Sequence, residues 1–98
     1  MTEQAEIAFS MLQFGAHPNW PGVRAVQEFP NGYSASVIRS PYSYGGEFGL
    51  YELAVMSGGS LDYSTPITDD VLGRLSEDEV TAALQQIAAL PAKDQTHA

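Results

Sequence analysis

The sequence lacks cysteine altogether and has few basic residues. Without cysteine it can form no disulfide framework, no thiolate metal site and no cysteine nucleophile. Four Lys and Arg residues stand against twelve Asp and Glu residues, so the formal net charge is -8. Binding to nucleic acids depends on Lys and Arg that neutralise phosphates. We therefore expect no direct binding of DNA or RNA.

Long apolar runs are also missing. No segment reaches the length of a transmembrane helix, and residues 1–14 contain none of the basic residues with which a secretory signal begins. We therefore expect no membrane association and a location in the cytoplasm. The length of 98 residues and a hydrophobic content of 44% predict a single domain over residues 1–98, with residues 91–98 as a flexible tail.

The middle of the chain has the pattern of an antiparallel sheet. Runs rich in β-branched and aromatic residues alternate with turn signals, and the dipeptide Asn31-Gly32 favours a hairpin because it readily adopts the positive φ of tight turns. These runs predict a meander of three to four strands. The expected strands are residues 23–29, 33–39, 50–56 and a short fourth at 61–63.

Helical patterns flank this sheet. Apolar spacing predicts a helix over residues 2–14, and a cap followed by two aspartates predicts a short helix over residues 68–73. Ser76 and Glu79 form a capping box at the start of a further helix that continues to about Leu90. The expected fold is therefore α+β, with the N-terminal helix and the C-terminal helices packed on one face of the sheet.

The segment SPYSYGGEFG, residues 40–49, is the first candidate for a functional site. A phosphate-binding loop would lead into a helix and often carries a Lys, whereas this segment leads into a strand and contains Glu47. Two interpretations stay open. Either one or two of the aromatic side chains Tyr42, Tyr44 and Phe48 fold back onto the sheet, or the segment is a protein-contact loop, since aromatic residues are enriched at interfaces.

Acidic residues of the C-terminal third are the second candidate. Six acids stand against one arginine between residues 62 and 79, among them Asp69, Asp70, Glu77 and Asp78. Positions in the first turns of helices explain most of these acids through the helix dipole. They also predict a locally anionic surface, which either only confers solubility, or binds a basic partner, or imitates the charge of nucleic acid.

Catalytic, metal and cofactor patterns are not recognisable in the sequence. His17 has no nucleophile motif to accompany it, and the carboxylates lack the spacing of a calcium-binding loop. The strongest rival to protein binding is a pocket for an anionic small molecule, formed by Tyr33, Arg39, Tyr42 and the glycine-rich loop. We expect no catalytic residue, no metal site and no bound cofactor.

Four motifs carry a resemblance to a known group of proteins. They are NGYSASVIR at residues 31–39, SYGG at 43–46, GLYELAV at 49–55 and TPITDDVLG at 65–73. The chain resembles, over about residues 29–80, small acidic proteins encoded by bacteriophages and prophages of actinobacterial hosts. The resemblance implies a phage accessory protein in the cytoplasm of an infected or lysogenic host, and it carries over no catalytic residue.

The leading hypothesis is a protein that is not an enzyme and acts by binding another protein of the host or phage. Such a partner would be a host defence factor or a nucleic-acid-processing factor, which the bound protein inhibits. Two alternatives stay open: a small-ligand-binding protein or minor enzyme that uses Arg39 and the aromatic loop, and a structural homodimer formed through an exposed sheet edge.

Overall fold

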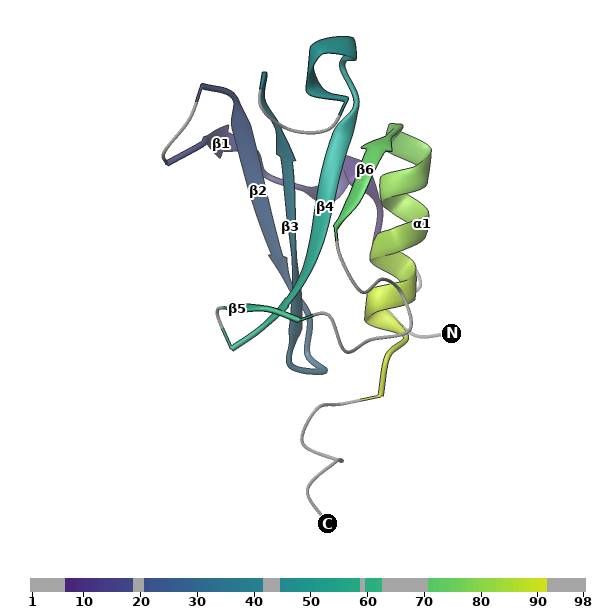
Figure 1. Cartoon of the computed structure of the whole chain (residues 1–98). Coiled ribbons are helices and arrows are strands. Elements are labelled where there is room, and N and C mark those ends of the chain that lie inside the picture. Colours follow the sequence, from purple (N-terminus) through teal and green to yellow (C-terminus); the bar gives the residue numbers. More distant parts are fainter. Residues whose placement is uncertain (1–6, 19–20, 42–44, 59, 63–70, 92–98) are drawn as a thin grey trace.

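The fold is α+β and is built on an antiparallel sheet (Figure 1). A computed structural model describes residues 7–18, 21–41, 45–58, 60–62 and 71–91. The strands follow the order β1-β2-β3-β4-β5, and β6 also pairs with β4. The strands are β1 (Gly15–Ala16), β2 (Val23–Glu28), β3 (Tyr33–Arg39), β4 (Tyr51–Ser57), β5 (Ser60–Leu61) and β6 (Leu72–Leu75).

The three central strands were predicted within a residue of their observed ends, and the short fourth strand corresponds to β5. Cross-strand register explains their sequence pattern. Ala25, Val37 and Leu53 lie opposite one another on neighbouring strands and are buried on the same face. Side chains alternate between faces along a strand, so Ile38 lies on the other face. The two successive apolar residues Val37 and Ile38 thus face opposite sides of the sheet, with Val37 buried and Ile38 partly buried.

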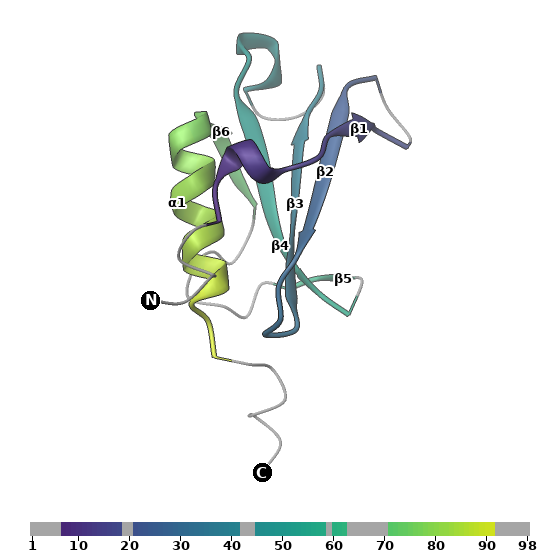
Figure 2. The same cartoon turned by 180° about the vertical axis from the view of Figure 1, so that it is seen from behind.

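Helix α1 (Glu77–Ala88) covers the buried face of the sheet (Figure 2). Its start is the predicted capping box: the Ser76 hydroxyl accepts from the Glu79 amide, and the Glu79 carboxylate accepts from the Ser76 amide. Val80, Leu84 and Ile87 recur at helical spacing and are fully buried in the core. The predicted C-terminal helix is thus confirmed.

The helix expected over residues 2–14 is not confirmed. Residues 1–6 lie outside the described part of the chain, and residues 9–11 form a single 3-10 turn, η2 (Phe9–Met11). Phe9 and Phe14 both contact the Tyr51 ring, with centroids 4.9 and 5.7 Å from it. Five residues apart on a helix, the two rings would point in different directions. The extended path after η2 lets both reach the same tyrosine.

A strand replaces the expected short helix near residue 72. Leu72 pairs with Leu53 and Leu75 pairs with Tyr51, with a register shift between the two pairs. This bulge places Arg74 in the left-handed region, at φ 57°. The local signal for a helix start was overridden because β6 completes the edge of β4 and its leucines pack against the core. The part of the prediction at residues 68–70 lies outside the described residues.

The turn between β2 and β3 ties the sheet to α1. Gly32 takes the positive φ, 93°, and its amide donates to the Phe29 carbonyl. The side chain of Asn31 has another role: its amide nitrogen donates to the carbonyls of Ile87 at 2.8 Å and Leu90 at 3.1 Å. Asn31 is only 8% exposed, so this turn residue caps the C-terminal end of α1 from inside the protein.

Candidate functional site

The connection from β3 to β4 contains a short, well-hydrogen-bonded element, the 3-10 turn η3 (Gly46–Phe48). Gly45 and Gly49 flank it with φ values of 81° and 78°, which favour glycine. Three backbone bonds close the turn: the amides of Phe48 and Leu50 donate to the Gly45 carbonyl, and the Gly49 amide donates to the Gly46 carbonyl. The two left-handed glycines on either side of η3 therefore give this turn a defined conformation, and it projects from one end of the sheet (Figure 1).

Phe48 is the most exposed large apolar side chain of the described residues, with 81% of its surface accessible. Most of a phenylalanine ring is normally buried, so an exposed phenylalanine on a closed turn is unusual. Of the other residues predicted for this site, Glu47 lies within η3, next to Phe48 in the chain. Tyr42 and Tyr44 lie outside the described residues.

The η3 turn is braced against β6. A Cβ atom added to Gly45 would lie 2.9 Å from the Arg74 Cα atom and 3.0 Å from the Leu50 Cβ atom. Backbone at this position therefore approaches the β6 bulge too closely for any side chain. Gly45 and Arg74, both in the left-handed region, therefore lie in contact. No sequence pattern predicts this contact, because the pattern of residues 68–73 favours a helix.

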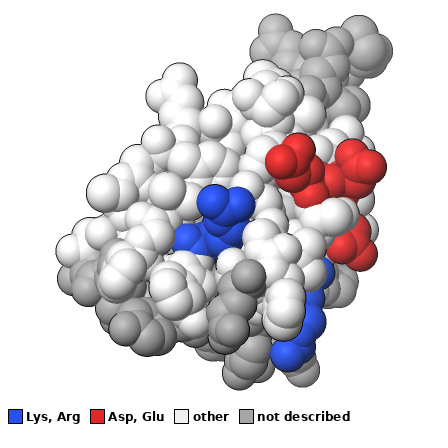
Figure 3. All heavy atoms as spheres, turned by 90° about the horizontal axis from the view of Figure 1, so that it is seen from above, with Lys and Arg blue, Asp and Glu red and all other residues white. Residues whose placement is uncertain are grey.

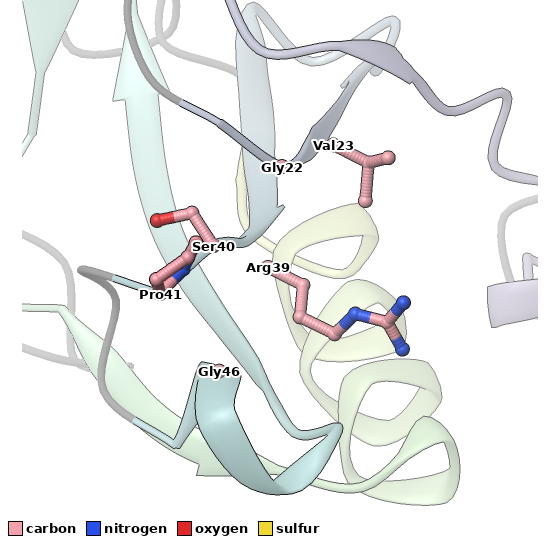
Figure 4. A pocket seen from close by; sticks show the side chains of 6 residues that line it. All are labelled: Gly22, Val23, Arg39, Ser40, Pro41 and Gly46. Atoms are coloured by element: carbon pink, nitrogen blue, oxygen red, sulfur yellow. The ribbon is translucent and has the colours of Figure 1, made fainter.

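A hollow of about 340 Å³ adjoins the same end of the sheet (Figure 4). Its polar side chains diverge: the Arg39 guanidinium extends on the Val23 side, whereas the Ser40 hydroxyl points to the opposite side. Arg39 also stacks over the Tyr51 ring, 5.6 Å from the centroid. The lining residues are Gly22, Val23, Arg39, Ser40, Pro41 and Gly46.

The structure does not bring together the residues proposed for an anionic-ligand pocket. Tyr33 and Arg39 are the first and last residues of β3, about 20 Å apart at the rise of an extended strand. Tyr33 borders a different hollow, at the β2–β3 turn. A small-molecule site usually has a few polar groups that converge on the ligand. The interpretation that joins Tyr33 to Arg39 is therefore wrong, although Arg39 itself lines a hollow.

The predicted acidic surface is divided. Glu77 and Asp78 are exposed in the first turn of α1, as their capping positions required. Asp62, which contributed to the count of six acids, is only 8% exposed and accepts a hydrogen bond from the Ser57 hydroxyl at 2.9 Å. It therefore contributes little to a surface charge. Asp69 and Asp70 lie outside the described residues.

Charge at the η3 end of the molecule is mixed. Figure 3 looks down on this end and shows acidic side chains gathered along one side, with basic side chains in the centre and at the rim. A surface that imitates nucleic acid would present regularly spaced negative charge. The described part of this end shows an acidic rim beside arginines.

Three further features were considered in the sequence, namely a metal site, His17 and a membrane-spanning helix. The described part of the chain contains no group of three or more His, Asp or Glu side chains that could hold a metal ion. The backbone amide of His17 donates to the Gly22 carbonyl, which closes the loop between β1 and β2. Among the described residues, no helix combines the length and apolar character needed to cross a membrane.

No protein-family model, no curated protein and no solved structure matches the chain. The fold is α+β with an antiparallel sheet, and among the described residues its most exposed large apolar side chain is Phe48 on η3.

Proposed function

We propose that this protein is not an enzyme and acts by binding another protein through Phe48. The observation that carries the proposal is the 81% exposure of Phe48 on a turn closed by three backbone hydrogen bonds. A large aromatic group on a pre-ordered turn loses little conformational entropy when it is buried, so it can dominate the energy of an interface.

Exposed carboxylates contribute to the same proposal. Glu77 and Asp78 lie at the start of α1, and Figure 3 shows acidic side chains grouped along one side of the end that carries η3. Charges at the rim of an interface mainly increase the association rate, whereas a central aromatic group determines how slowly the complex dissociates. The partner is therefore expected to offer an apolar pocket for Phe48 with basic residues beside it.

The biological setting of the proposal follows the resemblance to small acidic phage proteins. In that setting the protein acts in the cytoplasm of an infected or lysogenic bacterium, on a host or phage protein, such as a defence or nucleic-acid-processing factor that it inhibits. Binding through Phe48 is favoured over imitation of nucleic acid because Asp62 is buried and arginines lie close to the acidic rim.

A pull-down from an actinobacterial host lysate, followed by mass spectrometry, tests the proposal. Immobilised wild-type protein is compared with Phe48→Ala and with Met11→Ala, which removes another exposed apolar side chain, 56% accessible, from η2. We expect a partner that the wild type and Met11→Ala retain and Phe48→Ala loses. With the purified partner, Phe48→Ala should weaken binding by about 2 kcal/mol, a typical hot-spot value.

The proposal fails if every protein captured by the wild type is captured equally by Phe48→Ala. The role of the carboxylates is tested separately with Glu77→Gln/Asp78→Asn. We expect this variant to associate more slowly with the partner, and the difference from wild type to disappear as added salt screens the charges. An association rate unaffected by the substitutions would remove the acidic rim from the interface.

A further inference from the structure

The turn between β2 and β3 contains a pair of residues with its own covalent chemistry. The sequence has two asparagines, Asn19 and Asn31, and only Asn31 is followed by glycine. In an Asn-Gly pair the backbone nitrogen of the glycine can attack the side-chain carbonyl carbon of the asparagine, because glycine has no side chain to hinder the approach. The Asn31-Gly32 pair is therefore a candidate site of deamidation.

Deamidation at this pair proceeds in two steps. The Gly32 nitrogen gives up its proton to a base in the solvent and forms a bond to the Asn31 Cγ atom. The Asn31 side-chain nitrogen takes up a proton and leaves as ammonia, which closes a succinimide ring. Water then opens the ring at either of its carbonyl carbons and gives aspartate or isoaspartate. No electrons are transferred, and water is the co-reactant.

Contacts with α1 oppose the departure of the side-chain nitrogen. Asn31 Nδ2 donates to the Ile87 carbonyl at 2.8 Å and to the Leu90 carbonyl at 3.1 Å. The Asn31 side chain is only 8% exposed. A nitrogen held in this way cannot turn toward water, from which it must take up a proton before it leaves. Docking of the turn on α1 therefore keeps Asn31 unreactive.

Contacts within the hairpin favour the reaction. The Tyr33 amide donates to Asn31 Oδ1 at 3.1 Å, and this oxygen gains negative charge when the Gly32 nitrogen attacks. A donor at such an oxygen stabilises the charge that develops there. Gly32 is exposed, and its amide donates to the Phe29 carbonyl at 3.2 Å, a longer bond than the 2.9 Å bond from the Phe29 amide to the Tyr33 carbonyl. The hairpin thus keeps the reacting groups together without α1.

We propose that Asn31-Gly32 is a deamidation site controlled by α1. The reaction proceeds when the C-terminal end of α1 separates from the turn while β2 and β3 stay paired. A local opening at the end of a helix costs less free energy than unfolding of the whole domain. Leu90, whose carbonyl accepts from Asn31, is only partly buried, whereas Val80 and Leu84 nearer the start of α1 are fully buried.

Deamidation makes this opening permanent. Both products carry a carboxylate in place of the amide, and a carboxylate has no proton to donate to the Ile87 and Leu90 carbonyls. Its negative charge is also unfavourable at the C-terminal end of a helix. Isoaspartate lengthens the backbone of the turn by a methylene group as well. The turn cannot regain its bonds to α1, so a reversible opening becomes irreversible and limits the lifetime of the folded protein.

The rate of deamidation of the full chain in mildly alkaline buffer tests the proposal. Trypsin releases residues 25–39 as one peptide, and mass spectrometry measures its modified fraction. Isoaspartate in this peptide identifies the succinimide route, because direct hydrolysis of the amide gives aspartate alone. We expect isoaspartate to form more slowly in the native wild type than in the wild type unfolded in urea.

Two leucine variants separate local opening from global unfolding. Leu90→Ala removes packing at the end of α1 but keeps the backbone carbonyl that Asn31 contacts. It should accelerate deamidation about tenfold, the factor that corresponds to about 1.4 kcal/mol of lost docking energy. Leu12→Ala is the same change at another partly buried leucine on the core, between η2 and β1, and should leave the rate nearly unchanged.

Melting curves show that each variant is folded under the conditions of the assay. If Leu90→Ala does not fold, the smaller change Leu90→Val takes its place. Deamidated wild type, separated from the unmodified protein, should melt at a lower temperature, because it lacks the bonds from Asn31 Nδ2 to α1.

Four results would overturn the inference. The native and the unfolded wild type react at the same rate, or the product is aspartate without isoaspartate, or the deamidated protein melts like the wild type. The fourth is an equal acceleration by Leu12→Ala and Leu90→Ala, which would show that the reaction follows unfolding of the whole domain. None of these results depends on the function proposed for Phe48, which lies on η3.

Discussion

Replacement of Asn31 by alanine should cost this protein a large part of its stability. The Asn31 side chain makes three hydrogen bonds of 3.1 Å or less that alanine cannot replace, besides a longer one of 3.5 Å to the Ala88 carbonyl. Its amide nitrogen donates to the Ile87 and Leu90 carbonyls, and its oxygen accepts from the Tyr33 amide at 3.1 Å. All three connect the β2–β3 turn either to itself or to the C-terminal end of α1.

The expected loss follows from the number and burial of these bonds. A typical hydrogen bond contributes about 1 kcal/mol, and a buried group left without a partner costs about 1–3 kcal/mol. Three bonds at an 8% exposed side chain therefore give a loss of about 3 kcal/mol in the free energy of unfolding. In a domain of this length such a loss lowers the melting temperature by about 12–24 °C.

Thermal and urea unfolding measure the effect, with Gln27→Ala as a control. The Gln27 amide also donates to a backbone carbonyl, that of Glu28, but at an exposed position. We expect a change below about 0.5 kcal/mol there. A loss of less than about 1 kcal/mol for Asn31→Ala would refute the claim that this side chain stabilises the end of α1.

Asn31→Asp separates the donor from the acceptor. Aspartate keeps an oxygen for the Tyr33 amide but places a negative charge against the Ile87 and Leu90 carbonyls. At pH 7 it should destabilise the protein more than alanine does, because the carboxylate has no proton to donate. A protonated carboxyl can donate, so the difference from wild type should become smaller as the pH falls toward about 4.

Two further substitutions test local features. Gly45→Ala should destabilise the protein by at least about 2 kcal/mol more than Gly49→Ala. Both glycines have a positive φ, but only a methyl group at position 45 would clash with the Arg74 backbone. Equal melting temperatures of the two variants would contradict this. Ser76→Ala removes the acceptor for the Glu79 amide and should cost about 1 kcal/mol in urea unfolding; a wild-type midpoint would show that the capping box contributes nothing.

Local patterns predicted the parts of the fold that depend on local interactions. The capping box of α1 and the three central strands are determined by residues a few positions apart, and all are observed. The prediction of a helix over residues 2–14 failed because Phe9 and Phe14 pack against Tyr51, more than thirty residues away in the sequence. The prediction of a short helix near residue 72 failed for a similar reason, since the strand β6 found there pairs with β4. Tertiary contacts there override the local preference for a helix.

The candidate site shows the same division. The sequence predicted a hairpin loop and left open whether its aromatic residues are exposed; in the described part of that loop Phe48 is exposed to solvent. Burial of Asp62 depends on the geometry of the β4–β5 turn and on the Ser57 hydroxyl, so composition alone overstated the surface charge. The role of Asn31 was also hidden, because Asn-Gly is a sufficient turn signal without any contact to a helix.

The contacts of Asn31 have a consequence for the order of folding. The Asn31 side chain and the Ile87 carbonyl are 56 residues apart, and the Phe9 amide reaches the Thr81 hydroxyl across 72. The pairings of β2 with β3 and of β3 with β4 close much shorter loops, which cost less entropy. We expect the meander to form before α1 docks. Asn31→Ala should therefore mainly accelerate unfolding, and slow refolding only by the share of the Tyr33 bond within the hairpin.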